Sequence, residues 1–293
     1  MIILYEGKVY RPPSEARSLV LQTTTGCPYN QCYFCMMYNE KKFRIKSVEE
    51  IKEDVKNARK KLGDSYQSVF LADGNSILIK TEDLLEIIKY IKRYFPQVKR
   101  ITTYGSARYV VLKTVEELEE LREAGLTRIH TGMESGDREV LKRINKGTVP
   151  EEIIKAGKKV KDAGMELSEY YLVGVGGERL TENHARNSAA VINEIDPEFI
   201  RLRTFIPLPD TVLYDRYQSG KFRLLDPHQA LKEIKIFIEN LQGIESELLS
   251  DHVSNYWDIK GKLPGDKEKM VAEVEKALKQ AISEFRDPAR GFL

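Results

Sequence analysis

The sequence predicts an α/β fold in which parallel strands alternate with helices over the first two thirds of the chain. Six short apolar segments have the length of buried strands, at residues 18–25, 67–73, 98–104, 126–134, 166–177 and 198–207. Amphipathic helical segments separate them, and crossovers of this length join parallel strands by right-handed connections. Six such repeats fit either an open doubly wound sheet or an incomplete (β/α) barrel.

Capping residues and glycine stops predict where the intervening helices begin and end. Ser47, with Glu50 three residues later, forms a capping box at the start of the first long helix. Thr81 and Thr181 are expected to cap two later helices, and Gly125 is expected to end the helix before the fourth strand. The remaining helices are predicted at 137–144, 150–163, 226–242 and 265–285.

Size and composition limit the classes of protein to which the chain can belong. A chain of 293 residues that is 41% hydrophobic can bury a large core, as one domain or two. The 47 basic residues nearly balance the 45 acidic ones, so charge gives no signal for nucleic acid. No apolar run approaches the roughly 20 residues of a membrane span, and the N-terminus lacks the apolar core of a signal peptide. We therefore expect a cytoplasmic protein that does not enter a membrane.

The pattern along the chain divides it into three parts. We expect an N-terminal extension at 1–17, a core of strands and helices at 18–210, and a C-terminal helical and loop extension at 211–293 that covers the core. Within the extension, residues 250–262 combine polar and aromatic side chains in a way that is unusual for a linker. This segment is either a substrate-contacting cover or a packed surface loop.

The three cysteines of the chain, Cys27, Cys32 and Cys35, lie within nine positions directly after the first predicted strand. Their odd number, the length of the chain and the lack of a secretory signal argue against a disulfide framework. Three thiolates supply three ligands, so a four-coordinate centre built here keeps one position open for chemistry. A structural zinc site requires a fourth ligand, and a plant-type ferredoxin with the same spacing requires a fourth cysteine.

Other polar and glycine clusters follow the later strands. Asp73, Gly74 and Asn75 come after the second strand, Ser106 after the third, Glu134 and Ser135 at the end of the fourth, and Gly174 in the fifth. Because the carboxyl ends of parallel strands meet at one edge, all of these residues are expected on the same side as the cysteines.

Together, these residues resemble the radical S-adenosylmethionine (radical SAM) superfamily over roughly residues 18–207. Members of that family carry a C-x3-C-x2-C motif after the first strand of a partial (β/α)6, TIM-like barrel. Here Cys27 and Cys32 are separated by four residues instead of three, and the aromatic Phe34 precedes Cys35 as it does in the family. The resemblance implies that the three cysteines bind a [4Fe–4S] cluster whose fourth iron binds SAM.

The resemblance also implies where SAM would be bound. Asp73, Gly74 and Asn75 match the turn that receives the methionine amino group, and glycine there permits a close approach of the backbone. Gly174 belongs to a fifth-strand glycine segment near the adenine. Phe34 is expected to pack over the cluster and keep it dry.

Four side chains and one neighbouring serine complete the implied cofactor site. Ser106 and Glu134 are expected to hydrogen-bond the ribose hydroxyls, and Ser135 belongs to the same fourth-strand segment. Arg201 or Arg203, on the sixth strand, is expected to neutralise a carboxylate.

The histidines carry weaker signals. His130 is either a pocket residue beside Glu134 or a hydrogen-bonded core histidine, and His184 is expected to be solvated on its helix.

The implied function is reductive cleavage of SAM to methionine and a 5′-deoxyadenosyl radical, which abstracts hydrogen from a small-molecule or peptide substrate. An electron donor such as ferredoxin or flavodoxin is implied as a partner. No catalytic residue is assigned. Two other classes remain open on the residues alone: a non-catalytic iron–sulfur electron-transfer protein and a zinc-stabilised binding module.

Overall fold

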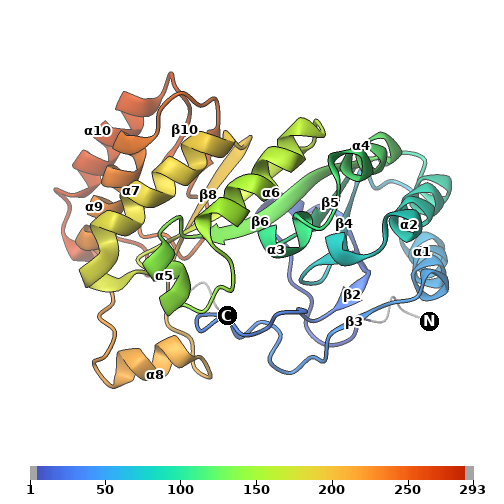
Figure 1. Ribbon diagram of the computed structural model, residues 1–293, viewed down its shortest axis with the longest axis horizontal. Helices are drawn as coiled ribbons and strands as arrows, with labels where there is room; N and C mark the ends of the chain where they lie inside the picture. Colours follow the sequence, from blue (N-terminus) through green and yellow to red (C-terminus); the bar gives the residue numbers. More distant parts are fainter. Residues whose placement is uncertain (1–4, 288–293) are drawn as a thin grey trace. The chain divides into compact units, whose positions relative to one another are not determined.

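The computed structural model describes residues 5–287 and divides them into two compact units (Figure 1). The first unit comprises residues 5–30, 37–131 and 158–167, and the second comprises 31–36, 132–157 and 168–287. The predicted core at 18–210 is thus shared between the units, each of which is described by itself. No helix among residues 5–287 is long and apolar enough to span a bilayer.

Four parallel strands form the sheet of the first unit, in the order β1-β4-β5-β6. Their bounds are Leu19–Gln22, Ser68–Ala72, Arg100–Tyr104 and Leu126–Glu134, the last three residues of β6 belonging to the second unit. Each strand pairs with the next of these four along the chain, as the predicted right-handed crossovers require. Val69, Phe70, Leu71 and Ile101 are fully buried at the centre of this sheet.

The helices of the first unit pack through one apolar face each. They are α1 (Val48–Leu62), α2 (Thr81–Tyr94), α3 (Ala107–Val110) and α4 (Val115–Ala124). Both halves of the predicted box at Ser47 and Glu50 form, so the start of α1 is confirmed. Thr114 and Glu117 make a second box at α4, and Gly125 ends that helix in a left-handed conformation.

The first predicted strand is shorter than expected. After β1, the chain continues as β2 (Thr24–Thr25), which pairs antiparallel with β3 (Arg44–Ile45) instead of with β4. Thr23 separates the two: its N–H and hydroxyl both donate to the carbonyl of Ala72, while its own carbonyl accepts from the N–H of Lys46. The cysteine loop therefore leaves from a small two-stranded ribbon.

In the second unit, β7 (Glu166–Val173), β8 (Phe199–Thr204), β9 (Glu247–Leu249) and β10 (Lys260–Lys262) lie in that order; the first two residues of β7 and the last five of α6 belong to the first unit. The pairs β7–β8 and β8–β9 are parallel, and β10 is antiparallel. The C-terminal extension thus adds two strands beside β8. The helices are α5 (Arg138–Arg143), α6 (Pro150–Asp162), α7 (Gly177–Ile195), α8 (Val212–Gln218), α9 (Pro227–Asn240) and α10 (Lys267–Ala277).

An aromatic stack joins β7 to the helices α7 and α9. The ring of Tyr171 lies 4.4 Å from that of Phe237 and 4.7 Å from that of His184, between ring centroids. His184 is completely buried, so its predicted solvation is wrong. It lies on the face of α7 that packs against β7, where its Nε2 is 3.2 Å from the carbonyl oxygen of Leu172.

Two predicted helix caps are also wrong. The helix α2 begins at Thr81 itself, whose hydroxyl bonds Glu117 and the ammonium of Lys113 instead of its own helix. The helix α7 begins at Gly177, four residues before Thr181, because the glycines of the preceding turn already bend the chain into helix. At the C-terminus, α10 ends at Ala277, earlier than the expected 285.

Candidate functional site

The three cysteines lie on one loop whose ends belong to different units. Cys27 belongs to the first unit, and Cys32 and Cys35 belong to the second. All three are half-buried, and none forms a disulfide. Within the described residues 5–287, no three Cys, His, Asp or Glu side chains are grouped as ligands of a single metal ion. An iron–sulfur cluster does not require the three ligands to converge on one ion, because each thiolate binds a different iron. Three reduced, half-exposed thiols are the donor set that fits it.

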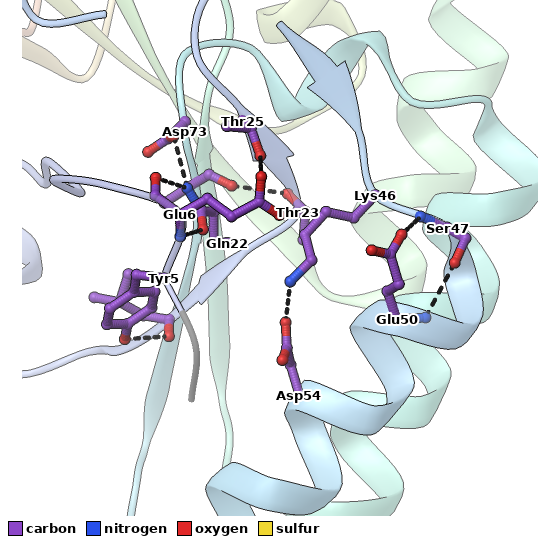
Figure 2. A network of polar contacts seen from close by, with 12 residues as sticks. Tyr5, Glu6, Gln22, Thr23, Thr25, Lys46, Ser47, Glu50, Asp54 and Asp73 are labelled. Carbon is purple, nitrogen blue, oxygen red and sulfur yellow. Dashed lines mark hydrogen bonds and ion pairs between the residues drawn. The ribbon is translucent and has the colours of Figure 1, made fainter. Parts of the chain in front are cut away.

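Asp73 fixes the backbone that leads into Cys27. Its Oδ2 accepts hydrogen bonds from Gln22 Nε2 at 2.9 Å, the Gly26 N–H at 3.1 Å and Lys41 Nζ at 2.8 Å. Gln22 in turn accepts from the N–H of Glu6 (Figure 2). Asp73 is completely buried, and its Oδ1 has no hydrogen-bond partner in the part of the chain that the structure describes.

Gly74 and Asn75 contact the cysteine directly. A Cβ at Gly74 would lie 2.9 Å from the Gly26 carbonyl oxygen and 3.1 Å from Cys27 Cα, so only glycine fits there. The amide of Asn75 approaches Cys27 Sγ at 3.9 Å through Nδ2 and accepts from the Ser106 N–H at 2.6 Å through Oδ1. The structure therefore brings together four of the residues predicted from the sequence, near the ends of β4 and β5: Cys27, Gly74, Asn75 and Ser106.

In the second unit, backbone hydrogen bonds clamp the segment from Cys32 to Cys35. The Tyr33 N–H donates to the Ile144 carbonyl at 2.9 Å, and the Tyr33 carbonyl accepts from the Leu213 N–H at 2.9 Å. Tyr33 and Phe34 pack against a buried apolar cluster made of Val140, Ile144, Leu172, Val175, Phe205 and Leu213. The predicted aromatic cover thus belongs to the core of its unit.

A lysine that the sequence did not indicate lies beside these cysteines. Lys146 Nζ is 3.0 Å from Glu134 Oε1 and 5.6 Å from the centroid of the Phe34 ring. Burial alone would lower the pKa of Lys146, but Glu134 and the thiols of Cys32 and Cys35 outweigh it and raise that pKa. The only sequence signal for this residue is its place in a tight turn, between Asn145 and Gly147, which both have positive φ.

Ser135 and Gly174 hold internal structure in place. Ser135 is completely buried, and its hydroxyl lies 2.9 Å from His184 Nδ1. The Gly174 N–H donates to the buried carboxylate of Glu233 at 2.7 Å, and the hydroxyl of Tyr171 donates to the same oxygen at 2.9 Å. This network fixes the ends of β6 and β7 inside the second unit.

The two predicted arginines of β8 have different surroundings. Arg201 Nε donates to the Ser168 hydroxyl at 3.1 Å, and its guanidinium lies 3.9 Å from an oxygen of Asp251. The guanidinium of Arg203 lies 4.8 Å above the centroid of the Tyr170 ring.

Of the two roles predicted for His130, the structure shows the hydrogen-bonded core histidine. It is buried, 3.2 Å from a carboxylate oxygen of Glu15, and its ring makes edge contacts with Phe70 and Tyr104.

The segment 250–262 leads from β9 into β10, which pairs with β9, and it contacts β8 through Asn255. Asn255 is buried and donates to the carbonyls of Leu202 at 2.8 Å and Ser250 at 2.9 Å, so its amide serves the fold. Burial, together with the charge of Arg203, lowers the pKa of His252 to about 4.

Comparison with known proteins decides the family. The model of the radical SAM superfamily matches residues 21–188, more than half of the chain. The chain belongs to the radical SAM superfamily. Its members use a [4Fe–4S] cluster and S-adenosylmethionine, and they act on substrates with electrons from a reductant. The chain is therefore a radical SAM enzyme, and its mostly parallel α/β fold is the partial barrel predicted above.

Individual relatives of this radical SAM protein are distant. It is 20% identical to the heme chaperone HemW of Bacillus subtilis over 72% of its own length and 57% of HemW. It is 24% identical to the biotin synthase of Methanococcus aeolicus, covering 74% of itself and 64% of that protein. The solved structure of methylornithine synthase (PylB) covers 88% of this chain and 68% of its own, with a TM-score of 0.54 and 18% identity. That likeness shows the fold alone.

Proposed function

We propose that Cys27, Cys32 and Cys35 hold a [4Fe–4S] cluster with one iron open to SAM. The observation that carries this proposal is the single loop of three reduced thiols, on a chain with no fourth cysteine. When bound, the cluster supplies the electron that cleaves SAM to methionine and a 5′-deoxyadenosyl radical, which abstracts hydrogen from the substrate. The side chains and backbone of the protein bind the cluster, orient SAM and the substrate, and shield the radical from water.

Four residues of the chain would tune and shield such a centre. Tyr33 and Phe34 exclude water on the side of the second unit, where the apolar cluster holds them. Asn75 directs an N–H at the sulfur of Cys27, and hydrogen bonds to ligating sulfurs raise the reduction potential of a cluster. The cation of Lys146 beside Cys32 and Cys35 stabilises added negative charge in the same way.

For SAM itself, we propose the residues that the sequence places at the strand ends. Gly74 and Gly174 carry no side chain at the ends of β4 and β7 and so leave room for the cofactor, and Ser106 and Glu134 are polar side chains that would bond it. Asp73 and Ser135 are completely enclosed by protein groups, and we therefore assign them to holding the backbone around the cofactor. Arg201 and Arg203 lie on β8, where either guanidinium would pair with a carboxylate.

The substrate is proposed to be a small molecule or peptide, and the reductant a ferredoxin or flavodoxin. The named relatives act on different molecules, so none of their substrates is carried over. A reducing, cytoplasmic compartment suits this chemistry because the ligand thiols must not oxidise.

Anaerobic reconstitution tests the proposal. The wild-type chain is expected to take up close to four irons and four sulfides and to form 5′-deoxyadenosine from SAM under reduction. Cys27→Ser, Cys32→Ser and Cys35→Ser should each abolish that product, while Ser219→Ala, at an exposed helix end, should not change it. Iron uptake without SAM cleavage would favour the electron-transfer alternative. Stoichiometric zinc with no iron and no SAM binding would favour the binding module.

A further inference from the structure

The face of β7 and β8 that lies away from helices α7 and α9 carries an unusual set of polar side chains. The register places Tyr170 opposite Arg201 and Leu172 opposite Arg203. Tyr171 contacts residues of α7 and α9, and side chains alternate along a strand. The four side chains paired in this register, those of Tyr170, Leu172, Arg201 and Arg203, therefore point to the opposite face. This is also the face on which Leu172 and Phe205 pack against Tyr33 and Phe34 of the cysteine loop.

Among the described residues, Arg203 is the one cation on this face whose charge has no anion beside it. Its guanidinium stacks on the ring of Tyr170, and its Nε is buried without a hydrogen bond among the described residues. No carboxylate forms an ion pair with Arg203 within residues 5–287. Arg201, two residues earlier, bonds Ser168 and has Asp251 beside it. A partly desolvated guanidinium gains most from an anionic partner.

A second donor lies on the segment that packs beside Arg203: Asn255 bonds the backbone of Leu202 and the hydroxyl of Thr204, on either side of Arg203, and the charge of Arg203 acts on the ring of His252. The N–H of Ser254 donates to Nδ1 of His252 at 3.2 Å, which requires Nδ1 to be the unprotonated nitrogen of a neutral ring. The proton of the neutral imidazole is therefore on Nε2, and that N–H has no partner in the described part of the chain. Arg203 and His252 together present donors and no acceptor.

We propose that Arg203, on its Tyr170 platform and assisted by the Nε2–H of His252, binds a carboxylate group of the substrate. This inference rests on the proposed function, which makes the face beside the cysteine loop the place where substrate meets the radical. A planar carboxylate matches the two-pronged guanidinium edge, and one guanidinium with one neutral N–H balances a single negative charge. The substrate class is thus a carboxylic acid, such as an amino acid or a peptide with a free C-terminus.

Arginine modification followed by peptide mass spectrometry tests this assignment without knowledge of the substrate. The full chain with its cluster is treated with phenylglyoxal in the presence of glutarate or of glutaramide, its uncharged diamide, at equal ionic strength. We expect glutarate to slow modification of Arg203 at least fivefold and glutaramide to leave it unchanged. Arg223, whose side chain is 80% exposed, is the internal control and should react equally in both.

Two further experiments decide whether the bound carboxylate comes from the substrate or from SAM, and whether the two-pronged guanidinium edge of Arg203 is needed. SAM alone should not protect Arg203; if it does, the arginine serves the methionine carboxylate of the cofactor and the proposal is overturned. Glutarate binding, measured by saturation-transfer NMR, should weaken about tenfold in Arg203→Lys, which keeps the charge but loses the fork, and should be unchanged in Arg223→Lys. Equal modification with glutarate and glutaramide would also overturn it. Protection by glutarate stands even if SAM is not cleaved, so a failure here is distinct from a failure of the proposed function.

Discussion

The ion pair between Asp73 and Lys41 gives the sharpest test of how the cysteine loop is anchored. The side chain of Asp73 is fully buried and that of Lys41 is 7% exposed, with 2.8 Å between Oδ2 and Nζ. Asp73→Asn keeps an acceptor for Gln22 and Gly26 but leaves the ammonium of Lys41 uncompensated. Removing one partner of a buried pair costs about 3–5 kcal/mol. Because the amide keeps part of the network, we expect a loss of about 3 kcal/mol in the free energy of unfolding.

Urea unfolding of the iron-free chain, followed by circular dichroism, measures this loss. Lys41→Met in the Asp73→Asn background removes the orphaned charge, so the double variant should be more stable than the sum of the two single losses by about 1–3 kcal/mol. The matched control is Glu151→Gln. It breaks an exposed ion pair, in which the side chain of Glu151 is 68% exposed and that of Arg138 is 61% exposed, and should leave the free energy of unfolding unchanged within error. A loss below about 1 kcal/mol for Asp73→Asn would refute the reasoning.

Three further perturbations follow from the structure. Gly74→Ala places a methyl group 3.1 Å from Cys27 Cα, so iron bound per chain after reconstitution should fall by half or more; full iron content would show that the loop yields. Ser135→Ala removes a buried hydroxyl and should lower the free energy of unfolding by about 1–3 kcal/mol in urea titration, where no change would mean that the network is dispensable. The hydrogen bond from Arg44 lowers the pKa of Glu50 to about 2. The contribution of this interaction to the free energy of unfolding is therefore complete above about pH 5 and is lost as the pH falls through 2. Both side chains are about 40% exposed, so Glu50→Gln should remove no more than about 1 kcal/mol at pH 7 and clearly less at pH 2, where about half of the carboxylates are protonated in the folded state; an equal loss at both would contradict this sign.

The order of strands and helices could be predicted because it depends on local patterns. The box at Ser47 and the glycine stop at Gly125 involve residues three or four apart, which the sequence shows directly. Thr181 has the same local signature as a cap, yet its hydroxyl bonds Glu233, 52 residues away, and the helix already begins at Gly177. His184 was misassigned for the same reason, since only the packing of α7 against β7 decides that it is buried.

The candidate site shows the same division between local and long-range information. The cysteine spacing and the residues Gly74 and Asn75 can be recognised from the local sequence, and the structure places these two residues beside Cys27; their role toward SAM stays a prediction. Lys41 and Lys146 were not predicted, because each meets its carboxylate only through the fold, across 32 residues for Lys41 and 12 for Lys146. A lysine that the fold buries cannot be told apart, in the sequence, from a lysine on the surface.

The most direct test of the account is electron–nuclear double resonance on the reduced, reconstituted chain with SAM labelled with oxygen-17 in its carboxylate. A cluster held by only three cysteines leaves an iron for the amino acid group of SAM, so a resolved hyperfine coupling to the label is expected. Bound SAM that shows no coupling, together with a fourth ligand contributed by the polypeptide, would contradict the account.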